Sequence, residues 1–170
     1  MEPAALRILV TGGTFDKSYD ELKGCLLFRD SHVQEMLRLG RSRLAVAVET
    51  LMLMDSLEMT DEHRARVLDA CRGAPEERLI ITHGTDTLEQ TARTVGTAAL
   101  PNTIVLTGAM VPYTFGSSDG LFNLGSALAF AQTLPHGTWV AMNGRAFRWD
   151  DVRKNRGTGV FEECGPDGRP

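Results

Sequence analysis

The sequence lacks the features that mark membrane-spanning, secreted and metal-binding proteins. No apolar run approaches the roughly 18 residues needed to cross a bilayer. Its three cysteines, Cys25, Cys71 and Cys164, do not have metal-site spacing, and their odd number excludes a fully paired disulfide framework. The start, with Glu2 followed at once by a strand-like apolar run, does not resemble a signal peptide. We therefore expect a reduced, cytoplasmic protein without a membrane span.

Basic residues are also too few for a nucleic-acid-binding protein. Lysine and arginine number 18 against 22 aspartates and glutamates, which gives a net charge of −4. A dedicated nucleic-acid binder normally carries a basic stripe, so we expect no such partner. Hydrophobic content of 42% and charged content of 24% are those of a globular protein. Without internal repeats, low-complexity segments or a linker, we expect one domain over residues 1–170, with a disordered tail from about 164 to 170.

Apolar segments with strand and helix character alternate along the chain. Near-continuous apolar runs are typical of strands that are buried on both faces. The alternation therefore predicts an α/β fold, in which a mostly parallel sheet is covered by helices on both faces. We expect residues 12–29 to form a loop or a loose hairpin. The expected strands are 6–11, 43–54, 77–82, 103–108 and 138–144, and the expected helices are about 31–40, 61–73, 86–98 and 121–133, with Asp30 or Ser31 and Thr60 or Asp61 as N-caps.

Polar residues and glycines collect where four of these strands end. The segments are TGGT (11–14), MDSLEMT (54–60), THGTDT (82–87) and TGAMVPYTFGSSDG (107–120). Ligands of open α/β sheets bind beside the carboxyl ends of the strands. Hydroxyls, carboxylates and backbone N–H groups are thus expected to converge in one crevice.

Each segment alone also has a simpler explanation. Serine, threonine and aspartate before a helix are more often caps than catalysts. TGGT lacks the third glycine of a dinucleotide-binding loop and the Gly-Lys-Ser/Thr ending of a P-loop, and it is no GxSxG elbow. We expect His83 to be a structural hydrogen-bonding residue and not a metal ligand.

Taken together, and in this order, the segments resemble the L-asparaginase family. The four that carry the resemblance are TGGT, HGTDTLEQTA (83–92), TGAM.P (107–112) and DDVRKNR (150–156). The resemblance covers about residues 8–161, and HGTDTLEQTA is its most specific part. It implies an amidohydrolase that converts L-asparagine to L-aspartate and ammonia, with some activity on glutamine, and that needs no metal or organic cofactor.

The resemblance implies catalytic roles for two threonines and their neighbours. Thr14 corresponds to the nucleophile and Thr85 to the second threonine. Lys154 corresponds to the lysine beside that second threonine, and Asp86 to the carboxylate that binds the substrate's α-ammonium. Tyr19 is the candidate for the family's mobile-loop tyrosine.

Two further positions are expected to bind substrate. Ser56 corresponds to the serine that holds the α-carboxylate, and Gly84 lies next to Thr85 in the same segment. Backbone N–H groups at the head of the 86–98 helix are expected to stabilise the oxyanion.

Family members typically carry a second, carboxyl-terminal domain that this sequence does not include. We therefore expect a site that is either completed differently or more open, and a homo-oligomer built on a dimer of the first domain. The alternative function is a catalytically silent amino-acid-binding or interaction domain. The combination of Thr14, Thr85, Asp86 and Lys154 favours the enzyme, because a binder needs neither threonine nor the lysine.

Overall fold

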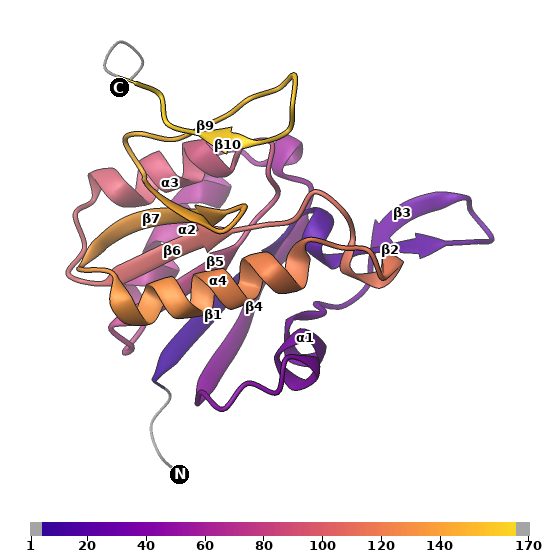
Figure 1. Ribbon diagram of the computed structural model, residues 1–170, viewed down its shortest axis with the longest axis horizontal. Coiled ribbons are helices and arrows are strands. Elements are labelled where there is room, and N and C mark those ends of the chain that lie inside the picture. The colour runs from indigo at the N-terminus through magenta and orange to yellow at the C-terminus, as the bar shows by residue number, and fades with distance from the viewer. Residues whose placement is uncertain (1–4, 166–170) are drawn as a thin grey trace.

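A six-stranded sheet forms the centre of the protein in the computed structural model, which describes residues 5–165 (Figure 1). Its strand order is β4-β1-β5-β6-β7-β8, and only β8 runs antiparallel to its neighbour. The predicted mostly parallel sheet is therefore confirmed. The strands are β1 (Leu6–Gly12), β4 (Val46–Met54), β5 (Arg78–Thr82), β6 (Thr103–Thr107), β7 (Gly137–Met142) and β8 (Arg145–Arg148).

Helices cover both faces of this sheet. Alternate residues along a strand point to opposite faces, so the buried strands feed two separate cores. In β5, Leu79 and Ile81 join the core that contains α2 and α3, whereas Ile80 joins the core that contains α1 and α4. The helices are α1 (Val33–Leu39), α2 (Asp61–Gly73), α3 (Leu88–Thr97) and α4 (Gly120–Thr133). In residues 5–165, every helix falls short of the length and apolarity of a membrane span.

The order of the parallel strands determines where a ligand would bind. From β1 the chain goes first to β4 on one side and then to β5 on the other, so the direction of winding reverses at β1. In open sheets the crevice at such a reversal, beside the carboxyl ends of the strands, is the usual binding site. Here the segments that meet at this point are those that follow β1 and β5.

Two short hairpins extend from the sheet. One pairs β2 (Lys17–Asp20) with β3 (Cys25–Phe28) and projects from the body of the molecule, as Figure 1 shows. This hairpin is one of the two conformations expected for residues 12–29. The other pairs β9 (Arg153–Lys154) with β10 (Phe161–Glu162) and lies above the carboxyl ends of the strands.

Several boundaries and caps differ from the sequence prediction. The strand expected from residue 43 begins at Val46, and the helix expected from residue 86 begins at Leu88. Thr60 caps α2 as predicted and shares a capping box with His63. The prediction of Asp30 or Ser31 as the N-cap of α1 is wrong, because His32 holds that position and its N–H donates to Asp16.

The strands after β7 were not predicted. Asn143 and Gly144 form a two-residue turn with φ of 56° and 77°, so both are left-handed and β8 folds back on β7. Asn-Gly is the residue pair that such a turn favours, and the signal was present in the sequence. Of the expected disordered tail, residues 166–170 lie outside the described residues. The N–H of Cys164 donates to Asp151 Oδ1 at 3.0 Å.

Candidate active site

Glycines bring the segments that follow β1, β4 and β5 into direct contact. A Cβ on Gly13, whose φ is 77°, would lie 2.3 Å from the backbone nitrogen of Gly84. A Cβ on Gly84 would in turn lie 2.6 Å from the Ser56 side chain. No side chain fits at either position, so the glycines permit an approach that larger residues would prevent. The structure thereby places the segments of Thr14, Ser56 and Thr85 side by side.

Thr14 begins a single 3-10 turn, η1 (Thr14–Asp16), directly after β1. Thr14 itself is partly exposed, whereas Phe15 and Asp16 are fully buried. The Asp16 carboxylate accepts hydrogen bonds from the His32 N–H at 2.8 Å and from the Ser31 hydroxyl at 3.0 Å. Burial raises the pKa of Asp16. The buried Asp16 carboxylate thus anchors the turn that begins with Thr14.

Thr85, Asp86 and Lys154 form a compact polar cluster at the end of β5. The Lys154 ammonium donates to Thr85 Oγ1 and to Asp86 Oδ1, each at 2.8 Å. The Lys154 side chain is only 7% exposed, whereas that of Asp86 is 40% exposed. The main-chain N–H of Lys154 donates to Glu89 Oε2 at 2.9 Å, which ties the β9–β10 hairpin to α3. The cluster therefore joins residues that lie almost 70 positions apart in the chain.

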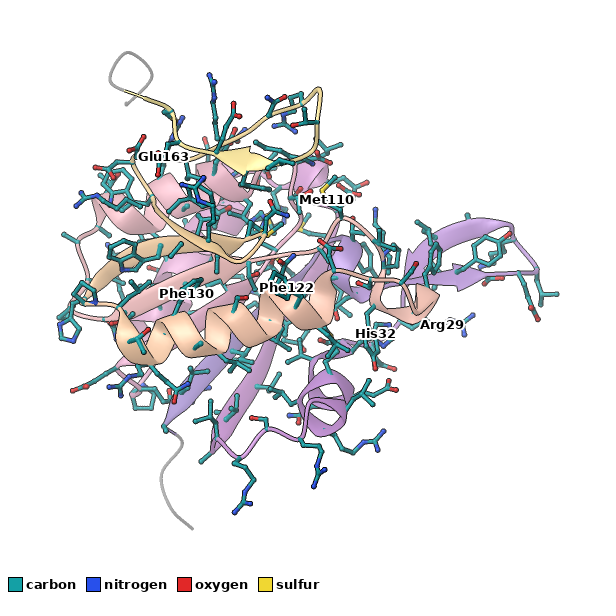
Figure 2. The ribbon with its side chains drawn as sticks, viewed as in Figure 1. Arg29, His32, Met110, Phe122, Phe130 and Glu163 are labelled. Carbon is teal, nitrogen blue, oxygen red and sulfur yellow. The ribbon has the colours of Figure 1, made fainter. Side chains whose placement is uncertain are left out.

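The hydroxyl of Thr85 has a second contact, with a residue that the sequence did not single out. It donates to the sulfur of Met110 at 3.5 Å, and Figure 2 shows Met110 at the edge where the strands end. A thioether is a weak acceptor, so this contact holds the proton loosely. Thr85 thus accepts a strong, charge-assisted hydrogen bond from Lys154 and donates only a weak one.

Arg156 is a second cation at the cluster, and it was also not among the predicted residues. Its guanidinium donates to Asp86 Oδ1 at 3.0 Å and to the main-chain oxygen of Asp86 at 2.6 Å. The same group lies 3.9 Å from Glu89 Oε1. The sequence contained Arg156 within DDVRKNR but gave no sign that it would join Lys154 at Asp86.

The turn that carries Ser56 is linked to the turn that carries Thr14. Ser56 is 1% exposed and begins the 3-10 turn η2 (Ser56–Glu58), for which Asp55 is the N-cap. Asp55 Oδ2 accepts from the Lys17 ammonium at 2.5 Å. This hydrogen bond is the main cause that lowers the pKa of Asp55. Since Lys17 follows η1 directly, the ion pair fixes the two turns relative to each other.

The hydroxyls of THGTDT do not cap α3. The N-cap of this helix, Thr87, makes no capping hydrogen bond, and its hydroxyl donates instead to the Ser56 carbonyl at 2.8 Å. Near the end of the neighbouring strand β1, Thr11 Oγ1 donates to the Thr82 carbonyl at 2.7 Å. The simpler explanation of this segment, helix capping, is therefore wrong for its side chains. The first N–H groups of α3 receive no side-chain cap from Thr87.

His83 is a structural residue, as predicted. It is fully buried, with Nδ1 2.8 Å from the Gly84 carbonyl and Nε2 2.7 Å from the Thr91 hydroxyl. Burial lowers its pKa to about 4, so the ring is neutral near pH 7. Within residues 5–165, no three histidine, cysteine, aspartate or glutamate side chains converge as a metal site would require.

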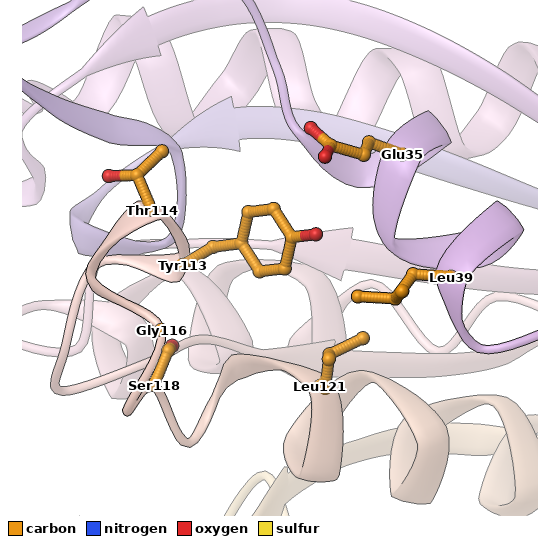
Figure 3. A pocket seen from close by; sticks show the side chains of 7 residues that line it. All are labelled: Glu35, Leu39, Tyr113, Thr114, Gly116, Ser118 and Leu121. Carbon is orange, nitrogen blue, oxygen red and sulfur yellow. The ribbon is translucent and has the colours of Figure 1, made fainter.

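Neither of the two tyrosines contacts the polar cluster of Thr85, Asp86 and Lys154 through a hydrogen bond in the part of the chain that the structure describes. Tyr19 is 54% exposed on β2 of the projecting hairpin. Tyr113 lies in η3 (Tyr113–Phe115) and lines a separate pocket of about 400 Å³, with its hydroxyl directed toward α1 and Glu35 (Figure 3). Burial and the Glu35 carboxylate raise the pKa of Tyr113. The role of Tyr19 thus stays a prediction.

Comparison with known proteins gives consistent matches across nearly the whole chain. The family model described as "Asparaginase, N-terminal" matches residues 5–162. A probable periplasmic L-asparaginase from Haemophilus influenzae is 36% identical over 120 residues, which are 66% of this chain and 34% of that protein.

Solved structures match over a still larger share of the chain. The thermostable L-asparaginase from Thermococcus kodakarensis superposes with a TM-score of 0.80 at 30% identity, covering 93% of this chain and 50% of that one. A probable cytoplasmic L-asparaginase from Campylobacter jejuni superposes with a TM-score of 0.82 at 26% identity, covering 96% and 54%. The chain therefore spans between a third and about half of the length of these relatives.

Proposed function

Because the chain belongs to the asparaginase family, through that family's N-terminal domain, we propose that it hydrolyses the side-chain amide of L-asparagine to L-aspartate and ammonia. The observation that carries this proposal is the contact of the Lys154 ammonium with both Thr85 and Asp86, at 2.8 Å each. A purely structural ion pair would not need a threonine hydroxyl between a buried lysine and a crevice.

Substrate recognition uses the charges of the α-amino acid. Asp86 binds the α-ammonium, Ser56 binds the α-carboxylate, and Gly84 and Thr85 border the side-chain amide. Asp86 retains 40% of its side-chain exposure and so is accessible to a ligand. A site that pairs both charges discriminates against analogues that lack one of them, since its own polar group would then lose its partner.

The first chemical step is attack by Thr14. Its Oγ forms a bond to the amide carbon while the C=O bond opens to an oxyanion, and the hydroxyl proton passes to an acceptor in the site. Main-chain N–H groups at the start of α3 stabilise the oxyanion, because the first N–H groups of a helix lack the acceptor four residues earlier that later ones have. Collapse of this intermediate breaks the C–N bond, and the departing nitrogen takes a proton and leaves as ammonia.

The second step removes the acyl group from Thr14. A water molecule attacks the ester, and the C–O bond to Thr14 breaks as the hydroxyl regains a proton. The proton lost by the water passes through the Thr85 hydroxyl to the departing oxygen of Thr14, and the Lys154 ammonium holds the Thr85 hydroxyl in position. Proton transfer by a positioned side chain typically accelerates such reactions by roughly 10²–10⁴-fold.

Tyr19 assists Thr14 from the hairpin in this proposal. The hairpin must bend toward the crevice for this contact, because β2 and β3 project from the body of the molecule (Figure 1). Two strands with little else to pack against open and close at low cost, which is typical of active-site lids.

The proposal extends to two wider properties, the location of the protein and its oligomeric state. The protein acts in the cytoplasm, in agreement with its three free thiols, Cys25, Cys71 and Cys164, and with the cytoplasmic C. jejuni relative. One relative carries a periplasmic name, so cell fractionation decides this point. The protein is a homo-oligomer built on a dimer, which light scattering coupled to size-exclusion chromatography measures.

Ammonia release from L-asparagine by the purified 170-residue chain tests the proposal directly. Release that Thr14→Ala abolishes is the expected result, and L-glutamine measured in parallel gives the side activity. Binding of L-aspartate without any release of ammonia would instead support a catalytically silent amino-acid-binding domain. Absence of both would reject the proposed substrate.

A further inference from the structure

The ion pair between Asp86 and Arg156 has no role in the reaction described above, although it lies at the proposed substrate site. Arg156 donates through Nη1 to the Asp86 carboxylate at 3.0 Å and through Nη2 to the Asp86 carbonyl at 2.6 Å. One guanidinium thus binds the side chain and the main chain of the same residue. This two-point contact fixes the orientation of the carboxylate.

Both cations at Asp86 use the same oxygen. Lys154 and Arg156 donate to Oδ1, and the 40% exposed side chain leaves Oδ2 to accept from a ligand ammonium. A third cation beside one carboxylate meets repulsion from the two already there. The repulsion is offset where the ligand brings its own anion to one of these cations, which an α-amino acid does.

Arg156 is the cation that can receive this anion. The Lys154 ammonium already donates to Thr85 and to Asp86, which leaves at most one of its three N–H donors for a ligand. Arg156 is 54% exposed, and a guanidinium has five N–H donors in a planar fork, of which the contacts with Asp86 use two. Such a fork matches the geometry of a carboxylate.

The backbone holds Arg156 in place. The preceding residue, Asn155, accepts through its side-chain oxygen from the N–H groups of Gly157 at 3.0 Å and Thr158 at 3.3 Å. Its own N–H donates to the Val160 carbonyl at 2.8 Å. The turn is therefore well defined, and Glu89, 3.9 Å from Arg156, balances the local charge.

We infer that Asp86 and Arg156 together form a receptor for the zwitterionic head of an α-amino acid. Asp86 takes the ammonium, and Arg156 takes the α-carboxylate and shares it with Ser56. Arg156 is thus a specificity-determining residue that separates α-amino acids from simple amines. The inference rests on the proposed function, because it takes the ligand to be an α-amino acid.

The test compares two ligands that differ only in the α-carboxylate. L-Aspartate, the proposed product, has it, and β-alanine is the same molecule without it. Dissociation constants for both are measured by NMR titration of the 170-residue chain, which also reports millimolar binding. We expect the chain to prefer L-aspartate, and Arg156→Met to reduce this preference about fivefold to tenfold, the size of one partly exposed charge-assisted contact.

Two further variants make the comparison specific. Arg156→Lys keeps the charge but not the fork, so it should retain part of the preference. Arg153→Met is the matched control, because Arg153 lies on the same hairpin, is 57% exposed and pairs with Glu162. It should leave both dissociation constants unchanged.

Several results would overturn the inference. An Arg156→Met protein that keeps the preference would show that Arg156 does not contact the α-carboxylate. If Arg156→Met binds L-aspartate more tightly than the parent chain does, Arg156 competes with the ligand for Asp86. If the variant loses affinity for L-aspartate and β-alanine equally, Arg156 only holds Asp86 in position. A parent chain that binds neither ligand, or both equally, also contradicts it. The expected binding pattern without ammonia release would leave the inference standing and reject the proposed reaction.

Discussion

Replacement of Lys154 by methionine should separate catalysis from stability. Methionine retains the length of the side chain and removes only the ammonium that contacts Thr85 and Asp86. The backbone of the hairpin should stay in place, because the Lys154 N–H is bound to Glu89 and the residue pairs with Phe161. The change thus removes one charged group from an otherwise unchanged site.

The expected loss of rate is large. If Lys154 and Thr85 act together in proton transfer, kcat should fall by roughly 10²–10⁴-fold, which equals about 3–5 kcal/mol of activation free energy. The loss of stability should be small. Asp86 is 40% exposed and keeps Arg156 as a partner, so the ion pair contributes at most about 1 kcal/mol to the free energy of unfolding.

Steady-state ammonia release and differential scanning calorimetry measure these two quantities on the same samples. A loss of about 1 kcal/mol lowers Tm by roughly 2–4 °C in a protein of this size. Arg153→Met, on the same hairpin, should change neither quantity. A Lys154→Met protein that keeps more than a third of the parent kcat would refute the role of Lys154 in proton transfer.

Three further predictions concern single residues. Thr14→Ala should abolish turnover without changing Tm, because Thr14 is a partly exposed residue at the start of a turn; a variant that still releases ammonia rapidly would remove it as the nucleophile. Asp86→Asn should raise KM for L-asparagine about tenfold, and succinamic acid, which lacks the α-ammonium, should be a poor substrate of the parent chain; equal turnover of the two amides would show that Asp86 does not bind the ammonium. His83 has a folded-state pKa of about 4, below its unfolded value, so the unfolded chain binds the extra proton, and the free energy of unfolding should fall by about 2 kcal/mol from pH 7 to pH 5. In urea unfolding at the two pH values, His83→Gln should lose most of this pH dependence. If the variant keeps the pH dependence of the parent chain, other groups cause it.

The sequence predicted most of the elements, and the meeting of the polar segments at one edge of the sheet, because both depend on local patterns. Continuous apolar runs such as LRILVT and ERLIIT are typical of strands buried on both faces, and β1 and β5 are buried in that way. Polar residues at the ends of such strands meet at one edge wherever the strands are parallel. The order of the strands could not be read from these patterns, and it is this order that makes β1 and β5 neighbours.

The errors fall where a residue distant in sequence supplies a contact. The N-cap of α1 was assigned to Asp30 or Ser31 by proximity, but His32 holds that position, and the carboxylate that accepts from its N–H belongs to Asp16, which follows β1. DDVRKNR contains three basic residues, and the resemblance to the family placed only Lys154 beside Thr85. The packing of the β9–β10 hairpin decides that Arg156 also points to Asp86, whereas Arg153 points to Glu162. Local sequence rules carry no information about such choices.

The hydroxyls that follow β5 fall into two groups, which differ in their hydrogen-bond partners. The hydroxyls of Thr87 and Thr91 have fixed partners inside the protein, the Ser56 carbonyl and the buried ring of His83. Loss of either would leave a buried polar group unpaired, which costs stability whatever the chain does chemically. Thr85 differs, because its partners are the Lys154 ammonium and the thioether of Met110, which is a weak acceptor. If Thr85 acts as proposed, variants at Thr87 and Thr91 should lower Tm, whereas variants at Thr85 should lower kcat.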